Sequence, residues 1–270
     1  MKKNLLESKI TIFIFDSGLG GVTILKYIKE VFFNVNFIYL LDNKYFPYGN
    51  KSQHFILQRL IQILKKISYY YNISLAIIAC NTASVSSFPQ IKKYFNFPIL
   101  GIFPVINLAI KNTQNKIIGL LATDTTLKNL QIKKKIKFFS KNYTIETLSS
   151  KKLVFLAEKK LLGYKLILNE IKKIFVSWFN LTKFPDTIIL GCTHFPLIIN
   201  ELKVILPKNI KFVDSKKDII INLINLEKKI KFVSNQKQNI VFYTQQNSYI
   251  KKTKLYFLNN GFNSFQEIKI

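Results

Sequence analysis

The sequence predicts an α/β fold in which mainly parallel sheets are covered by helices on both faces. Short apolar segments rich in β-branched and aromatic residues recur along the chain, and each ends at polar or glycine-rich positions. Between them lie segments whose apolar residues recur at three- and four-residue spacing, as on one face of a helix. Because strands that alternate with helices form parallel sheets, we expect a doubly wound arrangement.

The individual elements follow from these two patterns. The expected strands are residues 11–15, 37–41, 75–79, 117–122, 187–190 and, near the end of the chain, 240–244. The expected helices are residues 21–32 and 53–70, each with apolar residues along one face.

The same plan occurs twice along the chain on a coarse scale. Asp16 and Cys80 end two expected strands of the first half, and Thr123 and Cys192 hold similar positions in the second. With 270 residues the chain is long enough for two domains of roughly 100–150 residues. The domains that we expect are residues 1–103 plus 213–270 for the first and residues 104–212 for the second, with the boundary within 98–104.

The composition is that of a folded globular protein. Hydrophobic residues make up 49% of the chain, which lies within the ordinary range. No apolar run approaches the roughly 18–20 residues that span a bilayer, and no signal-peptide pattern opens the chain. We therefore expect no membrane partner and a cytoplasmic location.

The formal net charge of +27 would ordinarily suggest a nucleic-acid partner. However, only one of the 41 basic residues, Arg59, is an arginine, whereas nucleic-acid sites favour the bidentate guanidinium. Lysine, asparagine and isoleucine are abundant and share A/T-rich codons, which indicates a base-biased genome. We expect solvated lysine faces and no specific nucleic-acid partner.

The two cysteines stand in matching contexts. Each ends an expected strand and is followed by polar residues, Asn81 and Thr82 after Cys80, and Thr193 and His194 after Cys192. The start of a helix after such a strand favours anions, both a thiolate and a substrate carboxylate. Two widely separated cysteines indicate free thiols, and the two histidines of the chain form no ligand cluster with them, so we expect no metal site.

Two further groups can assist these thiols. Asp16 begins the loop Asp-Ser-Gly-Leu-Gly-Gly, where its carboxylate could accept a proton and the glycines permit close backbone approach. His194 stands two positions after Cys192 and could relay its proton. His54 has no comparable context, and we expect it on the surface.

Taken together, these motifs resemble the glutamate racemases of the aspartate/glutamate racemase superfamily. The resemblance is carried by the loop 16–21, by Pro47-Tyr48-Gly49 with Lys51 and Ser52, by Cys80-Asn81-Thr82-Ala83-Ser84, and by Gly191-Cys192-Thr193-His194. Supporting similarities are Ala122-Thr123 with Thr126, and Asp214-Ser215.

The resemblance implies two pseudosymmetric α/β domains with the active site in the cleft between them, and catalysis without pyridoxal phosphate, metal or other cofactor. Cys80 would take the α-proton from D-glutamate, assisted by Asp16, and Cys192 would take it from L-glutamate, assisted by His194. Glu158 would be a further acidic residue near the second thiol. The substrate-binding residues that it implies are Asp16, Ser17, Tyr48, Gly49, Asn81, Thr82, Thr123, Thr126, Thr193 and His194. The product D-glutamate would supply peptidoglycan synthesis.

Two thiols suit this chemistry because the α-proton is weakly acidic and each face of the carbon needs its own acid and base. The sequence also departs from the family pattern. The departures are Phe195 in place of a common tyrosine, Thr125 in place of a glycine, Ser149 and Ser150 where a cysteine is common, and residues 244–247 in place of a glycine-containing turn.

Three alternatives stay open. The first is an aspartate or other amino-acid racemase of the same superfamily, since substrate length depends on pocket shape. The second is a basic nucleic-acid- or topoisomerase-binding protein on a racemase scaffold, suggested by the charge of +27. The third is a redox dithiol formed by Cys80 and Cys192. The sequence also leaves a homodimer open.

Overall fold

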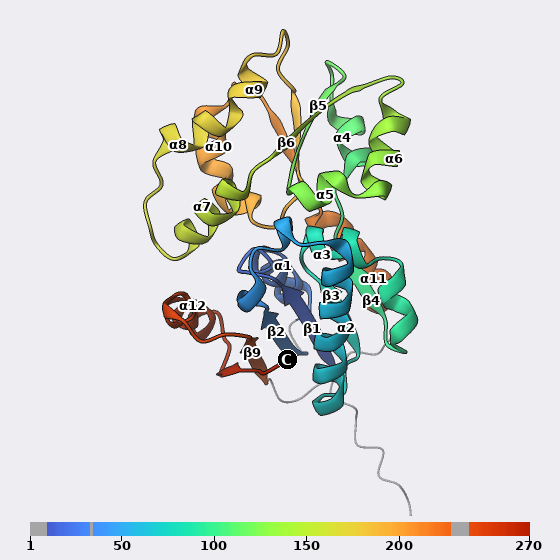
Figure 1. Cartoon of the computed structure of the whole chain (residues 1–270), viewed down its shortest axis with the longest axis vertical. Helices are drawn as coiled ribbons and strands as arrows, with labels where there is room; N and C mark the ends of the chain where they lie inside the picture. The colour runs from blue at the N-terminus through green and yellow to red at the C-terminus, as the bar shows by residue number, and fades with distance from the viewer. Residues whose placement is uncertain (1–9, 33–34, 228–237) are drawn as a thin grey trace, which may run out of the picture.

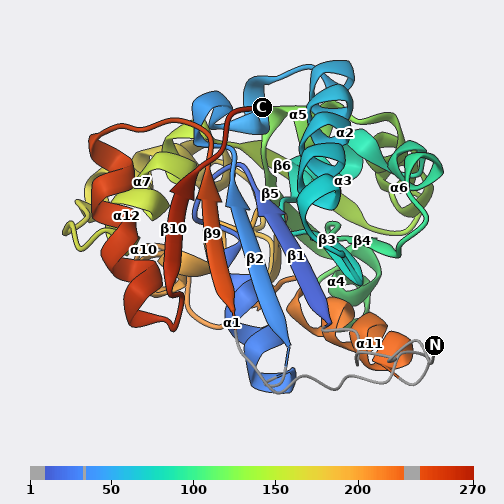
Figure 2. The same cartoon turned by 90° about the horizontal axis from the view of Figure 1, so that it is seen from below.

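The computed structural model describes residues 10–32, 35–227 and 238–270. Its strands form two sheets, one of six strands in the order β10-β9-β2-β1-β3-β4 and one of four in the order β6-β5-β7-β8. Every strand pair described in them is parallel. Figure 1 shows the two sheets with their helices as two stacked α/β units, and Figure 2 looks onto the six-stranded sheet from below. The predicted α/β fold class with mainly parallel sheets is confirmed.

The strands have the following bounds. The first sheet contains β1 (Thr11–Asp16), β2 (Asn36–Leu41), β3 (Leu75–Ile78), β4 (Ile99–Gly101), β9 (Asn239–Tyr243) and β10 (Ser264–Glu267). The second contains β5 (Ile117–Ala122), β6 (Thr144–Ser149), β7 (Thr187–Leu190) and β8 (Lys211–Val213). Each of the six predicted strands is present, with ends that differ by one residue at most. The domain boundaries stay a prediction.

The α-helices are α1 (Val22–Val31), α2 (Gln53–Tyr70), α3 (Asn81–Ser87), α4 (Ile106–Asn112), α5 (Asp124–Lys128), α6 (Leu130–Phe139), α7 (Lys151–Leu161), α8 (Leu168–Lys172), α9 (Val176–Phe179), α10 (Ile199–Ile205), α11 (Lys216–Glu227) and α12 (Ser248–Asn259). Short 3₁₀ turns are η1 (Asn43–Tyr45), η2 (Tyr48–Asn50), η3 (Gln90–Tyr94), η4 (Lys173–Phe175) and η5 (Phe195–Ile198). Both predicted helices are confirmed as α1 and α2. Within the described part of the chain, no helix has the length and apolar character needed to cross a bilayer.

The two sheets repeat one strand order. In the first sheet β1 lies between β2 and β3, with β4 beyond β3, and in the second β5 lies between β6 and β7, with β8 beyond β7. Strands β1 and β5 are therefore equivalent, as are β3 and β7. This correspondence places Asp16 and Thr123 at one pair of matching strand ends, and Cys80 and Cys192 at the other.

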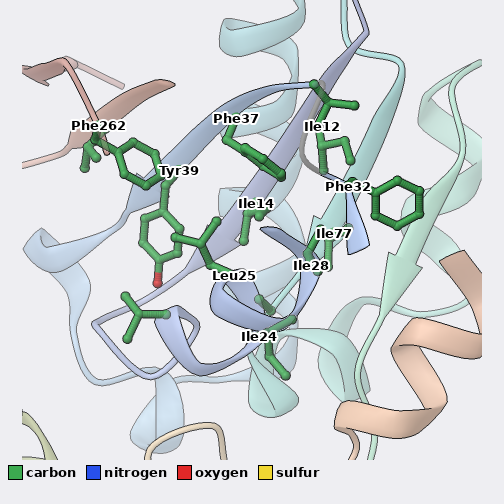
Figure 3. Close-up of a cluster of buried hydrophobic side chains, with 14 of the residues drawn as sticks. Ile12, Ile14, Ile24, Leu25, Ile28, Phe32, Phe37, Tyr39, Ile77 and Phe262 are labelled. Carbon is green, nitrogen blue, oxygen red and sulfur yellow. The ribbon is translucent and has the colours of Figure 1, made fainter. Parts of the chain in front are cut away.

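Both faces of the first sheet are buried, which explains the uninterrupted apolar runs of its inner strands. Ile12 and Ile14 of β1 pack into the core on the side of α1, whereas Phe13 and Phe15 pack into the core on the side of α2. Figure 3 shows the first of these cores, with side chains of α1 directed toward those of β1, β2 and β3. Full burial of each such side chain stabilises the fold by about 1.5–3 kcal/mol.

Four strands were not predicted from the sequence, and each is short or lies at a sheet edge. Strands β6 and β10 are edge strands with partly exposed side chains, so their apolar pattern is weak. Strand β4 lies within the segment 98–104, which was expected only as a boundary, and pairs with β3. Lys228, Lys229 and Lys231, which belong to the expected solvated lysine faces, lie outside the described residues.

Candidate active site

Cys80 and Cys192 hold equivalent positions after β3 and β7. Cys80 has extended backbone and is the N-cap residue of α3, while Cys192 lies between the end of β7 and the start of η5. Both are free thiols with 6% of their surface exposed. The structure thus places both predicted thiols at strand carboxyl ends, where ligands bind in open α/β sheets.

Cys80 is accompanied by the first loop of the chain. The hydroxyl of Ser17 lies 3.9 Å from the Cys80 sulfur and 3.4 Å from Asp16 Oδ1. Burial raises the pKa of Cys80 well above its usual value, and the charge of Asp16 raises it further, while a hydrogen bond from the Ala83 main chain opposes this shift. Cys80 is therefore a thiol at neutral pH, and its deprotonation requires a nearby base.

Asp16 is suited to be that base. It is fully buried, and burial raises its pKa from 3.8 to about 6, although the charge of His194 acts in the opposite direction. Its carboxylate accepts hydrogen bonds from the Gly18 amide at 3.0 Å and from the Thr193 hydroxyl at 3.1 Å. A carboxylate with a pKa near neutrality can both accept and return a proton.

Cys192 begins a chain of polar contacts. Its sulfur lies 3.6 Å from His194 Nδ1, and His194 Nε2 donates to Glu158 Oε1 at 2.6 Å. Burial alone would lower the pKa of His194, but hydrogen bonds to Cys192 and Glu158 raise it well above its usual value. A protonated imidazole between a sulfur and a carboxylate would stabilise a thiolate at this position.

Glu158 connects His194, which follows a strand of the second sheet, to residues that follow strands of the first sheet. It lies on α7 with 4% of its surface exposed, and it accepts hydrogen bonds from the Leu19 amide at 2.7 Å and the Tyr249 hydroxyl at 2.5 Å. Tyr249 lies on α12 and was not predicted from the sequence, because neither a motif nor a strand end marks it. Three hydrogen bonds hold the carboxylate in one position against His194.

The glycine loop after β1 lies against this group. A Cβ atom on Gly18 would lie 2.4 Å from Glu158 Oε1, and one on Gly20 would lie 2.5 Å from His194 Nδ1. These distances are too short for any side chain. The loop therefore needs glycine for close approach to the second half of the site.

A cluster of three hydroxyl groups joins the helix that follows Cys80 to the end of β5. Thr123 Oγ1 is 2.8 Å from Thr82 Oγ1 and 2.9 Å from Thr126 Oγ1. Next to Cys80, the side-chain nitrogen of Asn81 is buried without a hydrogen-bond partner. A buried donor without a partner costs about 1–3 kcal/mol unless a ligand accepts from it.

Tyr48 and Gly49 occupy the edge of this cluster. Gly49 lies so close to Thr123 that a Cβ atom would be 2.9 Å from the threonine Cβ. The Tyr48 hydroxyl donates to Asp42 Oδ2 at 2.5 Å, and the expected role of Tyr48 in substrate binding stays a prediction. The Ser17 hydroxyl lies 3.9 Å from the Cys80 sulfur and His194 Nδ1 lies 3.6 Å from the Cys192 sulfur, whereas His54 is on the surface as predicted.

A cavity of about 180 Å³ opens beside the hydroxyl cluster. Its lining comes from both halves of the molecule: Pro47, Gly49 and Asn50 on one side, and Thr123, Asp124, Ser149, Lys151 and Val154 on the other. Among the described residues, no group of three or more histidine, cysteine or acidic side chains is arranged to hold a metal ion.

The departures from the family pattern have structural roles. Thr125 donates to the main-chain oxygens of Gly49 and Lys51, both at 3.0 Å, and so ties α5 to η2. Ser150 caps α7 by accepting from the Leu153 amide at 3.1 Å. The hydroxyl of Ser149 donates to Asp124, that of Thr244 donates to Asp42, and Phe195 is fully buried.

Comparison with known proteins places this geometry in a family. A family model described as Asp/Glu/Hydantoin racemase matches residues 38–217. The chain is 44% identical over 257 residues to the glutamate racemase of Buchnera aphidicola subsp. Schizaphis graminum, covering 95% of this chain and 99% of the relative. It is 42% identical over 210 residues to the glutamate racemase of Pectobacterium atrosepticum, covering 78% of this chain and 74% of the relative.

A solved structure agrees with these relatives. Escherichia coli glutamate racemase, crystallised in complex with L-glutamate and the activator UDP-MurNAc-ala, superposes with a TM-score of 0.91 at 35% identity, covering 97% of this chain and 98% of that chain. The resemblance found in the sequence motifs is confirmed over nearly the whole chain. This chain belongs to the Asp/Glu/hydantoin racemase family.

Proposed function

We propose that this chain interconverts L-glutamate and D-glutamate by moving the α-proton between two cysteine thiols. The observation that carries the proposal is the equivalence of Cys80 and Cys192, which end corresponding strands of two sheets with one strand order. Glutamate is proposed as the substrate because the relatives at 42% and 44% identity are glutamate racemases.

Each thiol has its own assistant. Cys80 would take the proton from D-glutamate while Asp16 accepts the thiol proton through Ser17, which lies between the two groups. Cys192 would take the proton from L-glutamate as a thiolate beside the His194 imidazolium, with Glu158 holding the ring. In each direction the second thiol donates a proton to the opposite face of the carbon, and its assistant restores it.

The site must also hold the substrate without an electron sink. We assign the substrate carboxylates to the donors that flank the thiols: Ser17, Asn81, Thr82, Thr123, Thr126, Thr193 and the main chain at Gly49. The unpartnered amide nitrogen of Asn81 supports this assignment. Hydrogen bonds in a water-excluded site stabilise the developing negative charge at the α-carbon more than bulk water does.

Racemisation of aspartate is the runner-up, because the pocket shape decides substrate length. The relatives favour glutamate. Peptidoglycan synthesis as the use of D-glutamate, a cytoplasmic location and a homodimer are further predictions. Sedimentation of the purified chain would test the homodimer.

Racemisation in deuterated water tests substrate and mechanism together. Starting from either enantiomer of glutamate, we expect the inverted product to carry deuterium at the α-carbon from the first turnovers. The unreacted enantiomer should keep its hydrogen, because the two faces are served by different thiols. Turnover of aspartate in place of glutamate would overturn the proposed substrate. Equal early labelling of both enantiomers would instead indicate a single base.

A further inference from the structure

Tyr249 belongs to the acid-base group at Cys192, although it comes from the opposite end of the chain. Its hydroxyl donates to Glu158 Oε2 at 2.5 Å, while the other oxygen of that carboxylate accepts from His194 Nε2 at 2.6 Å. Tyr249 and Glu158 are 91 positions apart and lie on α12 and α7, which Figures 1 and 2 draw on the same side of the molecule.

The local structure holds the tyrosine ring in this position. Asn247 caps α12 by accepting from the Ile250 amide at 2.9 Å, which sets the start of the helix at Ser248 and places Tyr249 in its first turn. The ring of Phe46 stacks on Tyr249 with centroids 6.5 Å apart and also lies 5.8 Å from the His194 ring. Phe46 therefore covers both ends of the hydrogen-bonded chain.

On this basis we propose that Tyr249 is a positioning residue that tunes proton transfer at Cys192 by withdrawing charge from Glu158. The proposal rests on the proposed two-thiol mechanism. A hydrogen bond donated to one carboxylate oxygen weakens the attraction of the other oxygen for the imidazolium proton. Tyr249 thereby keeps His194 able both to hold a proton while Cys192 is a thiolate and to return it when Cys192 must donate.

The surroundings make Tyr249 a permanent donor. Burial raises its pKa well above the usual value, and the charge of Glu158 raises it further. The other titratable groups that interact with the Tyr249–Glu158–His194 chain are Asp16 on β1, Tyr39 on β2 and Cys192 after β7. None of them donates to Glu158 Oε2 in the hydrogen bonds that the structure describes.

The two histidines of the chain allow a direct test by nuclear magnetic resonance. His54 is exposed and serves as an internal reference, and a His54→Gln variant assigns the two signals. In full-length Tyr249→Phe protein we expect the titration midpoint of His194 to rise by about half a pH unit or more, because the carboxylate attracts the imidazolium proton more strongly. Tyr256→Phe is the matched control, since Tyr256 lies on the same helix and packs against the same core.

Kinetics supply the second readout. We expect kcat to fall about tenfold or more in Tyr249→Phe, as for loss of one hydrogen bond to a charged group, and the pH profile of kcat/KM to move to higher pH. The pH profile of kcat/KM must move equally with L- and D-glutamate as substrate. The reason is that a racemisation has an equilibrium constant of one, which makes kcat/KM equal in the two directions. The control variant should match the unmodified protein in both measurements.

The outcomes separate the two proposals. An unchanged or lowered His194 midpoint in Tyr249→Phe would overturn the role of Tyr249, even if the chain racemises glutamate. Failure of the unmodified protein to racemise glutamate would sink the proposed function, while the titration would still report whether Tyr249 acts on His194.

Discussion

The hydroxyl of Thr193 donates a hydrogen bond to Asp16 Oδ2 at 3.1 Å and joins the two halves of the site. Thr193 directly follows Cys192, whereas Asp16 contacts the Ser17 hydroxyl, which lies 3.9 Å from the Cys80 sulfur. The two acid-base groups are therefore one connected network, in which the charge of His194 lowers the pKa of Asp16 against the effect of burial. The variants below separate the contributions of its members.

Replacement of either thiol should stop racemisation but leave one face active. In Cys80→Ser we expect racemisation to fall by about a thousandfold or more, because a serine hydroxyl is a far weaker acid and base at carbon than a thiol. Cys192 should still exchange the α-proton of L-glutamate with deuterated water. Cys192→Ser should show the mirror result with D-glutamate. Near-normal turnover of either variant in both directions would contradict the two-base mechanism.

Asp16 should make the folded protein less stable as the pH rises. Its pKa is about 6 in the fold and 3.8 ordinarily, so the folded state binds the proton more tightly than the unfolded state. Stability from this group is full below about pH 4 and is lost between pH 4 and 6, a change on the order of 3 kcal/mol. Urea unfolding across this range should show that Asp16→Asn removes the loss.

Asp124→Asn is the control for that measurement. Asp124 is exposed and paired with Lys128, and this hydrogen bond to Lys128 opposes burial and lowers its pKa, so its effect on stability has the opposite sign. A loss of stability between pH 4 and 6 that persists in Asp16→Asn would show that another group causes it.

Glu158→Gln should lower the titration midpoint of His194, the reverse of the change expected for Tyr249→Phe. The amide keeps the shape but removes the negative charge that helps to raise the pKa of His194. We expect racemisation to fall about a hundredfold, since the imidazolium no longer supports the Cys192 thiolate. Retention of a raised midpoint would mean that Cys192 alone holds the imidazolium.

Arg59→Lys should destabilise the fold although it preserves charge. Arg59 makes two hydrogen bonds of 2.9 Å to the two oxygens of Asp42, with both side chains buried, and Asp42 in turn holds Tyr48. A lysine cannot reproduce this paired geometry, so we expect a loss of about 2 kcal/mol or more in urea unfolding. Lys65→Arg on the same helix is the control, and an equal loss in both would contradict the assignment.

The same Arg59 shows what composition could and could not predict. Its rarity among 41 basic residues argued against a nucleic-acid site, but nothing local marked it as the partner of Asp42. The inner strands were predictable because burial on both faces leaves continuous apolar runs. The edge strands β6 and β10 were not, because partial exposure interrupts that pattern.

The sequence by itself determined the alternation of strands and helices and the position of each thiol at a strand end, because both depend on neighbouring residues. It also carried the motifs of the family. Only the tertiary structure decided which groups meet: Tyr249 with Glu158, Thr193 with Asp16, and Tyr48 with Asp42. The first two of these hydrogen bonds join residues 91 and 177 positions apart, and such pairing depends on how the two sheets pack, which no local pattern records.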